Sequence, residues 1–361
     1  MNIEKRNIKN DLTGGNPHYF IFDNLKFLLI IFVVLGHMAG DYIEYHPSDN
    51  ASEWLVCSPF KSFFIFVYAF HMPLFLFISG IFQKRESDKF NADSVISYVI
   101  LGFLLKILIA VSLMLFTSSM DSSYFGLLGQ DGVFWYLFVL AGYKGLCYLL
   151  RKVKPSLIIT LSVMIALFSG YDNELGDWLY LSRFVVFFPF YYVGFCLKPE
   201  QILNFCRKVY VRIFSVTALV LWIWICFAKI DVIYPYRGLF TARNPFADVS
   251  MSNCEFWNRG IAMIISAVLC IVFISLSTTK KIPMITKFGT RTLQVYFWHK
   301  TVIYILINYG MVKKLINKFP NDWWAVYLLL GLVITFVLSF EIFGKPINGV
   351  INSVKNREEK K

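Results

Sequence analysis

The chain has 361 residues, of which 57% are hydrophobic, 18% are aromatic and only 16% are charged. A soluble domain carries about 25% charged residues, so this composition excludes an ordinary soluble protein and predicts a polytopic helical membrane protein. The formal net charge of +12 comes largely from lysine and arginine residues in the loops between apolar segments. Such residues set membrane topology, so we do not interpret the charge as a nucleic-acid-binding surface. The seven cysteines have no CxxC spacing, which predicts neither a zinc site nor a disulfide framework.

The apolar segments predict an all-α fold with about ten transmembrane helices, because each is close to the roughly 20 residues that span a bilayer. We expect one domain over residues 1–361, with short cytoplasmic tails at about 1–18 and 344–361. The predicted spans are residues 19–40, 58–82, 94–117, 132–150, 155–170, 179–197, 209–230, 259–278, 291–311 and 323–343.

Lysine and arginine residues gather in alternate loops of this arrangement. Basic clusters occur at residues 5–9, 84–89, 151–154, 207–212 and 280–287, whereas the opposite loops begin almost without cations. Because basic loops stay on the cytoplasmic side, we expect a multi-pass protein of the cell membrane with both termini in the cytoplasm.

The first predicted helix contains two ionisable residues, Lys26 and His37. Such a group costs roughly 2.5–3.5 kcal/mol inside a bilayer, which makes it a candidate functional residue. Eleven residues of helix turn through about 1,100° and rise about 16 Å, so both side chains lie on one stripe. Such a stripe suits a cation that holds an anionic cosubstrate near the cytoplasm, at Lys26, and a base deeper in the membrane, at His37. A snorkelling lysine with an interfacial histidine is the alternative, and the spacing alone favours it.

The second predicted helix places His71 and Pro73 near its middle. A proline kinks a helix and frees backbone carbonyls, while Ser79 and Gly80 allow a neighbouring helix to approach closely. We expect His71 to lie at a depth between Lys26 and His37, as a second catalytic candidate.

Further along the chain, other charged side chains interrupt the apolar segments. Lys106 lies mid-span and requires a partner, whereas Arg183 and Glu341 lie near helix ends and are able to snorkel. His299 and Lys300 are adjacent, so they do not share a helix face.

The predicted outer loop at residues 231–258 is long and contains arginines, aromatics and prolines. Loops of this length are often functional. A sugar- or phosphate-binding lid and a plain solvated loop both fit this composition.

Five segments of the chain form an ordered set of motifs. They are "FDNLKFLLIIFVVLGH" at 22–37, "FHMPLFLFISGIF" at 70–82, "VFWYLFVLAGYKGL" at 133–146, "RFVVFFPFYYVGF" at 183–195 and "FGTRTLQVYFWHK" at 288–300. The first has a cation eleven residues before a histidine. Taken in order, the segments resemble the acyltransferase family 3 membrane proteins, and within them the fucose 4-O-acetylase-like branch.

This resemblance implies transfer of an acetyl group from cytoplasmic acetyl-CoA to a hydroxyl of a cell-envelope sugar or polysaccharide. No metal is expected. The acceptor hydroxyl would be deprotonated by a histidine, or the histidine would carry the acetyl group transiently. The residues assigned to these roles are His37 and His71 for catalysis, Lys26, Lys84, Arg85 and His299 for the acetyl-CoA contacts, and Trp135, Tyr136 and Arg183 for the acceptor.

Two other functions compete with acyl transfer. A transporter or flippase of a lipid-linked glycan also needs charges within the membrane, although the inverted repeats common in transporters are not visible in the sequence. The second is a metal or haem site on His37, His71 and His299, but the sequence contains no ligand motif such as HExxH to support it. The expected partners are the envelope glycan and the lipid bilayer, and the oligomeric state stays open.

Overall fold

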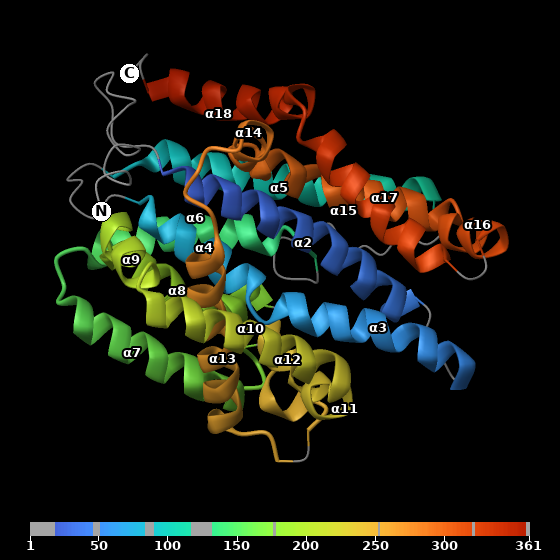
Figure 1. Cartoon of the computed structure of the whole chain (residues 1–361). Helices are drawn as coiled ribbons and strands as arrows, with labels where there is room; N and C mark the ends of the chain where they lie inside the picture. Colours follow the sequence, from blue (N-terminus) through green and yellow to red (C-terminus); the bar gives the residue numbers. More distant parts are fainter. Residues whose placement is uncertain are drawn as a thin grey trace.

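The computed structural model describes residues 19–45, 51–83, 90–116, 132–175, 178–251, 253–319 and 322–358. Within these ranges every regular element is a helix (Figure 1), which confirms the all-α prediction. The longer helices are α2 (Phe20–Tyr45), α3 (Ala51–Tyr68), α4 (His71–Ile81), α5 (Ala92–Phe116), α6 (Trp135–Leu150), α7 (Pro155–Phe168), α8 (Leu181–Cys196), α9 (Pro199–Cys206), α10 (Val209–Ala228), α13 (Phe256–Leu276), α14 (Pro283–Gly289), α15 (Thr292–Asn308), α16 (Met311–Lys318), α17 (Trp323–Leu338) and α18 (Lys345–Glu358). Two helical turns, α11 (Ile230–Ile233) and α12 (Arg237–Phe240), lie between α10 and α13.

The described residues contain fewer long apolar helices than the ten predicted spans. Five stretches of the described chain are long and apolar enough to cross a bilayer, and two bent helix pairs raise the number to seven at most. Helix α6 is apolar but has only 16 residues, fewer than the roughly 20 that hydrocarbon requires. Helix α8 ends at Cys196, and α9 then leaves at 99°. The prediction of ten spans is therefore not confirmed.

Helix α2 crosses the middle of the molecule and contacts α3, α4, α13, α14, α15 and α17 (Figure 1). Two thirds of its apolar window, 67%, is buried inside the protein, compared with 22% for the peripheral helix α10. Asn24 fixes its first turns, because its amide donates to the carbonyls of Thr278 and Lys280 and its oxygen accepts from Thr286. Residues placed along α2 are thus held in the centre of the fold.

The second predicted span is interrupted, as the proline there led us to expect. Helix α3 ends at Tyr68 and α4 begins at His71. Pro73 has no N–H to donate to the carbonyl of Ala69, and the Ser266 hydroxyl of α13 donates to that carbonyl instead, at 2.5 Å. The carbonyl that Pro73 leaves without a helical donor is therefore satisfied, and His71 is buried at the start of α4.

Helices α4 and α8 approach each other through glycines. A methyl group built on Gly80 would lie 2.1 Å from the carbonyl oxygen of Tyr191, and one on Gly194 would lie 2.2 Å from that of Phe77. No larger side chain fits between two backbones this close. The close approach expected at Gly80 therefore occurs, and α8 is its partner.

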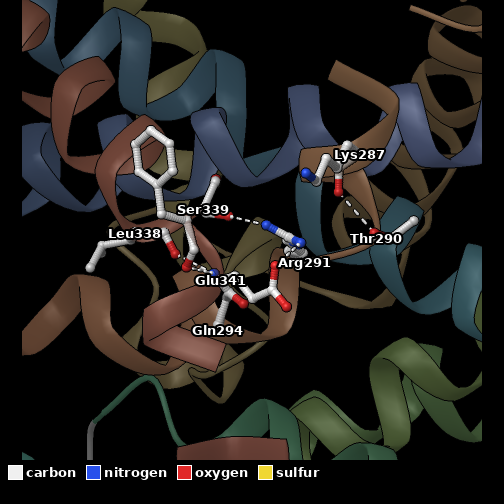
Figure 2. Close-up of polar contacts among 8 residues, drawn as sticks. Lys287, Thr290, Arg291, Gln294, Leu338, Ser339 and Glu341 are labelled. Atoms are coloured by element: carbon white, nitrogen blue, oxygen red, sulfur yellow. Dashed lines mark hydrogen bonds and ion pairs between the residues drawn. The ribbon is translucent and has the colours of Figure 1, made fainter. Parts of the chain in front are cut away.

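Polar side chains at the start of α15 and just before it contact the bend after α17 (Figure 2). Gln294 donates to the carbonyls of Leu338 and Phe340, at 2.6 and 2.8 Å. Arg291 forms an ion pair with Glu341 at 3.0 Å. The two Gln294 hydrogen bonds satisfy carbonyls near the end of α17, where a helix leaves carbonyls without partners.

The chain beyond this bend, expected as a short tail at 344–361, is helical as far as Glu358. This helix, α18, lies over α5 (Figure 1) and buries Ile347 and Val354. Burial of these two apolar side chains explains why the segment packs on the helical bundle.

Candidate functional site

A cavity of about 600 Å³ lies beside α2, within the range of roughly 300–1,000 Å³ that is usual for ligand sites. Its walls come from α2, α3, α4, α6, α8, α15 and the segment between α10 and α13. Four of the predicted site residues line it together, namely His37, His71, Trp135 and Arg183. They belong to four different helices, so the tertiary fold brings them to one place.

His37 lies in a cluster of rings at the wall of this cavity. The hydroxyl of Tyr68 is 3.4 Å from its Nδ1, and the Tyr68 ring is 4.7 Å from that of His71. The ring of His299 on α15 is 5.2 Å from the His37 ring. Two further imidazoles and a phenol therefore surround the proposed base.

The tautomers of the two supporting histidines follow from their backbone contacts. His299 Nδ1 is 2.8 Å from the carbonyl of Tyr296, and His71 Nδ1 is 2.9 Å from that of Val67. Since a carbonyl only accepts, both Nδ1 atoms carry the proton, and each Nε2 of the neutral ring is an acceptor. Within the described residues, the buried Nε2 of His299 has no hydrogen-bond partner.

A second cavity, of about 130 Å³, contains Lys26. Ser79 and Tyr136 also line it, and their hydroxyls are 3.3 Å apart. The two cavities share three lining residues, which are Val33, Met72 and Tyr296. Lys26 and His37 thus face adjoining cavities along one side of α2.

Lys26 has a carboxylate beside it that the sequence analysis did not consider. Its ammonium lies 2.7 Å from the carboxylate of Asp23, one turn earlier on α2, and 5.7 Å from the Phe82 ring centroid. A paired ammonium attracts a second anion less strongly than a lone one. Lys84 and Arg85, the other predicted phosphate contacts, lie outside the described residues.

The predicted acceptor residues are divided between the two cavities. Trp135 lines the larger cavity with Arg183, whose guanidinium lies 5.1 Å from its ring, while the neighbouring Tyr136 lines the smaller one. Tyr296 stands between them: its ring is 5.1 Å from that of Tyr136, and its hydroxyl donates to the carbonyl of Val133.

The sequence analysis missed Asp41. The first predicted span ends at residue 40, but α2 continues to Tyr45 and Asp41 forms a buried ion pair with Lys300. Asp41 follows His37 by four residues and so shares its helix face, a signal that was available in the sequence. Lys106, for which no partner was predicted, lies 5.2 Å from the Phe134 ring.

A family model described as an acyltransferase domain matches residues 19–341. The chain belongs to acyltransferase family 3. All the helices that line both cavities lie within the matched range, so the protein is a membrane acyltransferase whose family implies an acyl donor. This membership confirms the resemblance of the five sequence segments.

One curated relative of this acyltransferase is the nodulation protein NolL of Sinorhizobium fredii (strain NBRC 101917 / NGR234). The two proteins are 46% identical over 67 residues, which is 19% of this chain and 16% of NolL. The match thus spans about a sixth of the length of that relative. No solved structure matches the chain. In the part that the structure describes, no group of three or more His, Cys, Asp or Glu side chains is placed to hold a metal ion.

Proposed function

We propose that this acyltransferase moves an acetyl group from cytoplasmic acetyl-CoA to a hydroxyl of a cell-envelope sugar or polysaccharide. The observation that carries the proposal is the pair of adjoining cavities along α2, one beside Lys26 and one beside His37, with Val33, Met72 and Tyr296 between them. A donor entering beside Lys26 and an acceptor entering beside His37 would meet at this boundary.

The donor side of the proposal rests on Lys26. It lies about 16 Å from His37 along the helix, a distance on the order of an extended pantetheine arm. Its ammonium would contact a phosphate of CoA, in competition with Asp23. Lys84 and Arg85 follow α4 directly in the sequence and would add charge at the same end.

The chemical step assigns the base role to His37. Its neutral imidazole would take the proton of the acceptor hydroxyl while that oxygen attacks the thioester carbonyl. The bond from the carbonyl carbon to sulfur then breaks, and the proton goes to the leaving CoA thiolate. In the covalent version, the imidazole nitrogen attacks the thioester carbonyl and the C–S bond breaks to give an acetylimidazolium and the CoA thiolate. The acceptor oxygen then attacks the acetyl carbon, the C–N bond breaks to restore neutral imidazole, and the hydroxyl proton goes to the thiolate. His71 lines the same cavity and would assist in either version.

We assign His299 to the positioning of His37. The sequence analysis gave it a contact with acetyl-CoA, but His299 lines neither of the two cavities, and its ring packs 5.2 Å from that of His37. From this position, outside both cavities, His299 would orient the His37 ring and would not contact the acyl donor. Trp135 and Arg183 line the larger cavity and would contact the acceptor, with Tyr136 at the boundary.

The proposed topology places both termini in the cytoplasm of a cell-membrane protein. This topology rests on the alternation of basic loops along the sequence. In the fold, the basic cluster at residues 280–287 lies beside the start of α2, where Asn24 donates to the carbonyl of Lys280. Cysteine-accessibility labelling tests the topology: residue 152 should react only from the cytoplasmic side, and residue 257 only from the outside. Reversed labelling would contradict the donor role of Lys26.

Acetyl transfer is measured with purified protein, radiolabelled acetyl-CoA and the envelope polysaccharide of the cells that make the protein. His37→Ala is expected to lose label transfer by about 10²–10⁴-fold while it still binds acetyl-CoA. Lys26→Gln should weaken acetyl-CoA binding, Lys26→Arg should retain much of it, and Lys314→Gln on α16 serves as the control. Near wild-type transfer by His37→Ala would contradict the mechanism.

The same assay addresses the alternative of a glycan transporter or flippase. A transporter would move the glycan across a vesicle membrane without incorporating label from acetyl-CoA. Transport without labelling would therefore contradict acetyl transfer and support the alternative.

A further inference from the structure

One wall of the larger cavity comes from the chain between α10 and α13, the segment that the sequence left open as a lid or a solvated loop. Residues 234–250 of this segment contribute Tyr234, Arg237, Arg243 and Asp248, among others, to the cavity lining. The segment is therefore part of the site and does not extend freely into solvent.

Buried hydrogen bonds fix this wall. The hydroxyl of Ser182, at the start of α8, donates to the carbonyl of Ala242 at 2.8 Å. Arg259 of α13, which is only 1% exposed, donates to the carbonyl of Asn244 at 3.1 Å. Ala242 holds a left-handed conformation with φ of 54°, which is unfavourable for a residue with a side chain and persists only where the surroundings enforce it. The arginines of the segment are thus presented from a fixed backbone.

The charged side chains that line the cavity are mostly cationic. They are Arg183, Arg237, Arg243, Lys300, Asp41 and Asp248. Lys300 and Asp41 form an ion pair with each other, which leaves three guanidinium groups and one carboxylate facing the cavity. A concave surface with an excess of one charge attracts ligands of the opposite charge.

Arg237 is the cation of this set that is open to a ligand. No carboxylate in the described ranges forms an ion pair with it, and its guanidinium lies 5.2 Å from the centroid of the Phe64 ring. Packing on an aromatic face leaves the in-plane N–H donors of a guanidinium available for a bidentate contact with an oxyanion.

Arg237 is also connected to the proposed base through two stacked rings. Phe64 stacks on Tyr68 with ring centroids 3.7 Å apart, and the Tyr68 hydroxyl is 3.4 Å from Nδ1 of His37. A group bound at Arg237 would therefore lie on the same side of the cavity as His37, two rings away. An acceptor bound at Arg237 would extend past the Phe64 and Tyr68 rings toward His37.

We propose that the acceptor is acidic, and that Arg237 binds a carboxylate or phosphate group on it while the neighbouring sugar hydroxyl reaches His37. This inference rests on the proposed function, because it makes the anion part of the acyl acceptor. CoA is the competing anion for this cavity. The proposed donor role of Lys26 assigns CoA to the adjoining cavity, which Val33, Met72 and Tyr296 separate from this one.

Binding to the purified full-length protein in detergent tests this proposal without any need for catalysis. The probes are glucuronate and glucose 1-phosphate, and glucose is the uncharged control. The readout is the rise in the midpoint temperature of unfolding that each ligand causes. Wild type should bind at least one of the two acids about tenfold or more tightly than glucose, as expected for a charge-assisted contact. Preference for glucuronate identifies a sugar carboxylate as the group, and preference for glucose 1-phosphate identifies a phosphate.

Three variants complete the test. Arg237→Gln should remove the preference for the acid, Arg237→Lys should retain part of it, and Arg151→Gln should leave it unchanged. Arg151 is the matched control because its guanidinium also packs on an aromatic ring, that of Tyr148, outside both cavities.

Equal binding of glucose and both acids by wild type would overturn the proposal, as would an unchanged preference in Arg237→Gln. Weaker acetyl-CoA binding by Arg237→Gln, with sugar-acid binding unaffected, would also overturn it and assign the cavity to the donor. Acetyl transfer is measured separately, with labelled acetyl-CoA. If the protein binds sugar acids through Arg237 but transfers no label, the acid-binding site is supported and the proposed acetyl transfer is contradicted.

Discussion

The ion pair between Asp41 and Lys300 connects α2 to α15, the two helices that bring His37 and His299 together. Only 6% of the Asp41 side chain and 8% of the Lys300 side chain are exposed. The ammonium of Lys300 also lies 4.5 Å from the Tyr304 ring. Removal of one charge leaves the other buried without this counter-charge. The predicted consequence is a large loss of stability from either single substitution and a smaller loss from both together.

The expected magnitudes follow from this burial. Loss of one partner of a buried pair costs about 3–5 kcal/mol, whereas replacement of both by uncharged residues of similar volume is often close to neutral. Asp41→Asn and Lys300→Met should therefore each lower the free energy of unfolding by about 3–5 kcal/mol. The double variant should be more stable than either single variant, which gives a coupling energy of several kcal/mol.

The measurement is reversible unfolding by denaturant in detergent for wild type and the three variants. Glu341→Gln provides the control, because its carboxylate also forms an ion pair, with Arg291, but its side chain is 75% exposed. Exposed pairs contribute about 0–1 kcal/mol. The reasoning is refuted if Asp41→Asn costs no more than Glu341→Gln, or if the double variant shows the sum of the two single losses.

Three further substitutions test packing and the catalytic cluster. Gly194→Ala places a methyl group 2.2 Å from the Phe77 carbonyl and should cost at least about 1–3 kcal/mol, whereas Gly349→Ala, with open space around it, should cost nothing. Ser266→Ala removes the 2.5 Å hydrogen bond to the carbonyl at the α3–α4 break and should cost about 1–3 kcal/mol in unfolding free energy. His299→Gln should lower acetyl transfer about tenfold to a hundredfold with unchanged acetyl-CoA affinity, and a weakened affinity instead would return His299 to the donor site.

The sequence by itself determined the properties that depend on local pattern. Apolar segment length predicted a helical membrane protein, Pro73 predicted a break in the second span, and the order of five motifs predicted the family. The eleven-residue spacing of Lys26 and His37 predicted one helix stripe, and both side chains line adjoining cavities on α2. Helix periodicity and covalent geometry act over a few residues, so a single chain segment contains the information that they need.

The tertiary structure decided which distant residues meet. His37 and His299 are 262 positions apart, and Asp41 and Lys300 are 259 apart, separations for which one sequence contains no periodic signal. The bends after α8 and α17 were not predicted, because length and hydropathy do not specify where a helix turns. The wall that presents Arg237 likewise depends on hydrogen bonds from Ser182 and Arg259, which form only when α8 and α13 pack beside it.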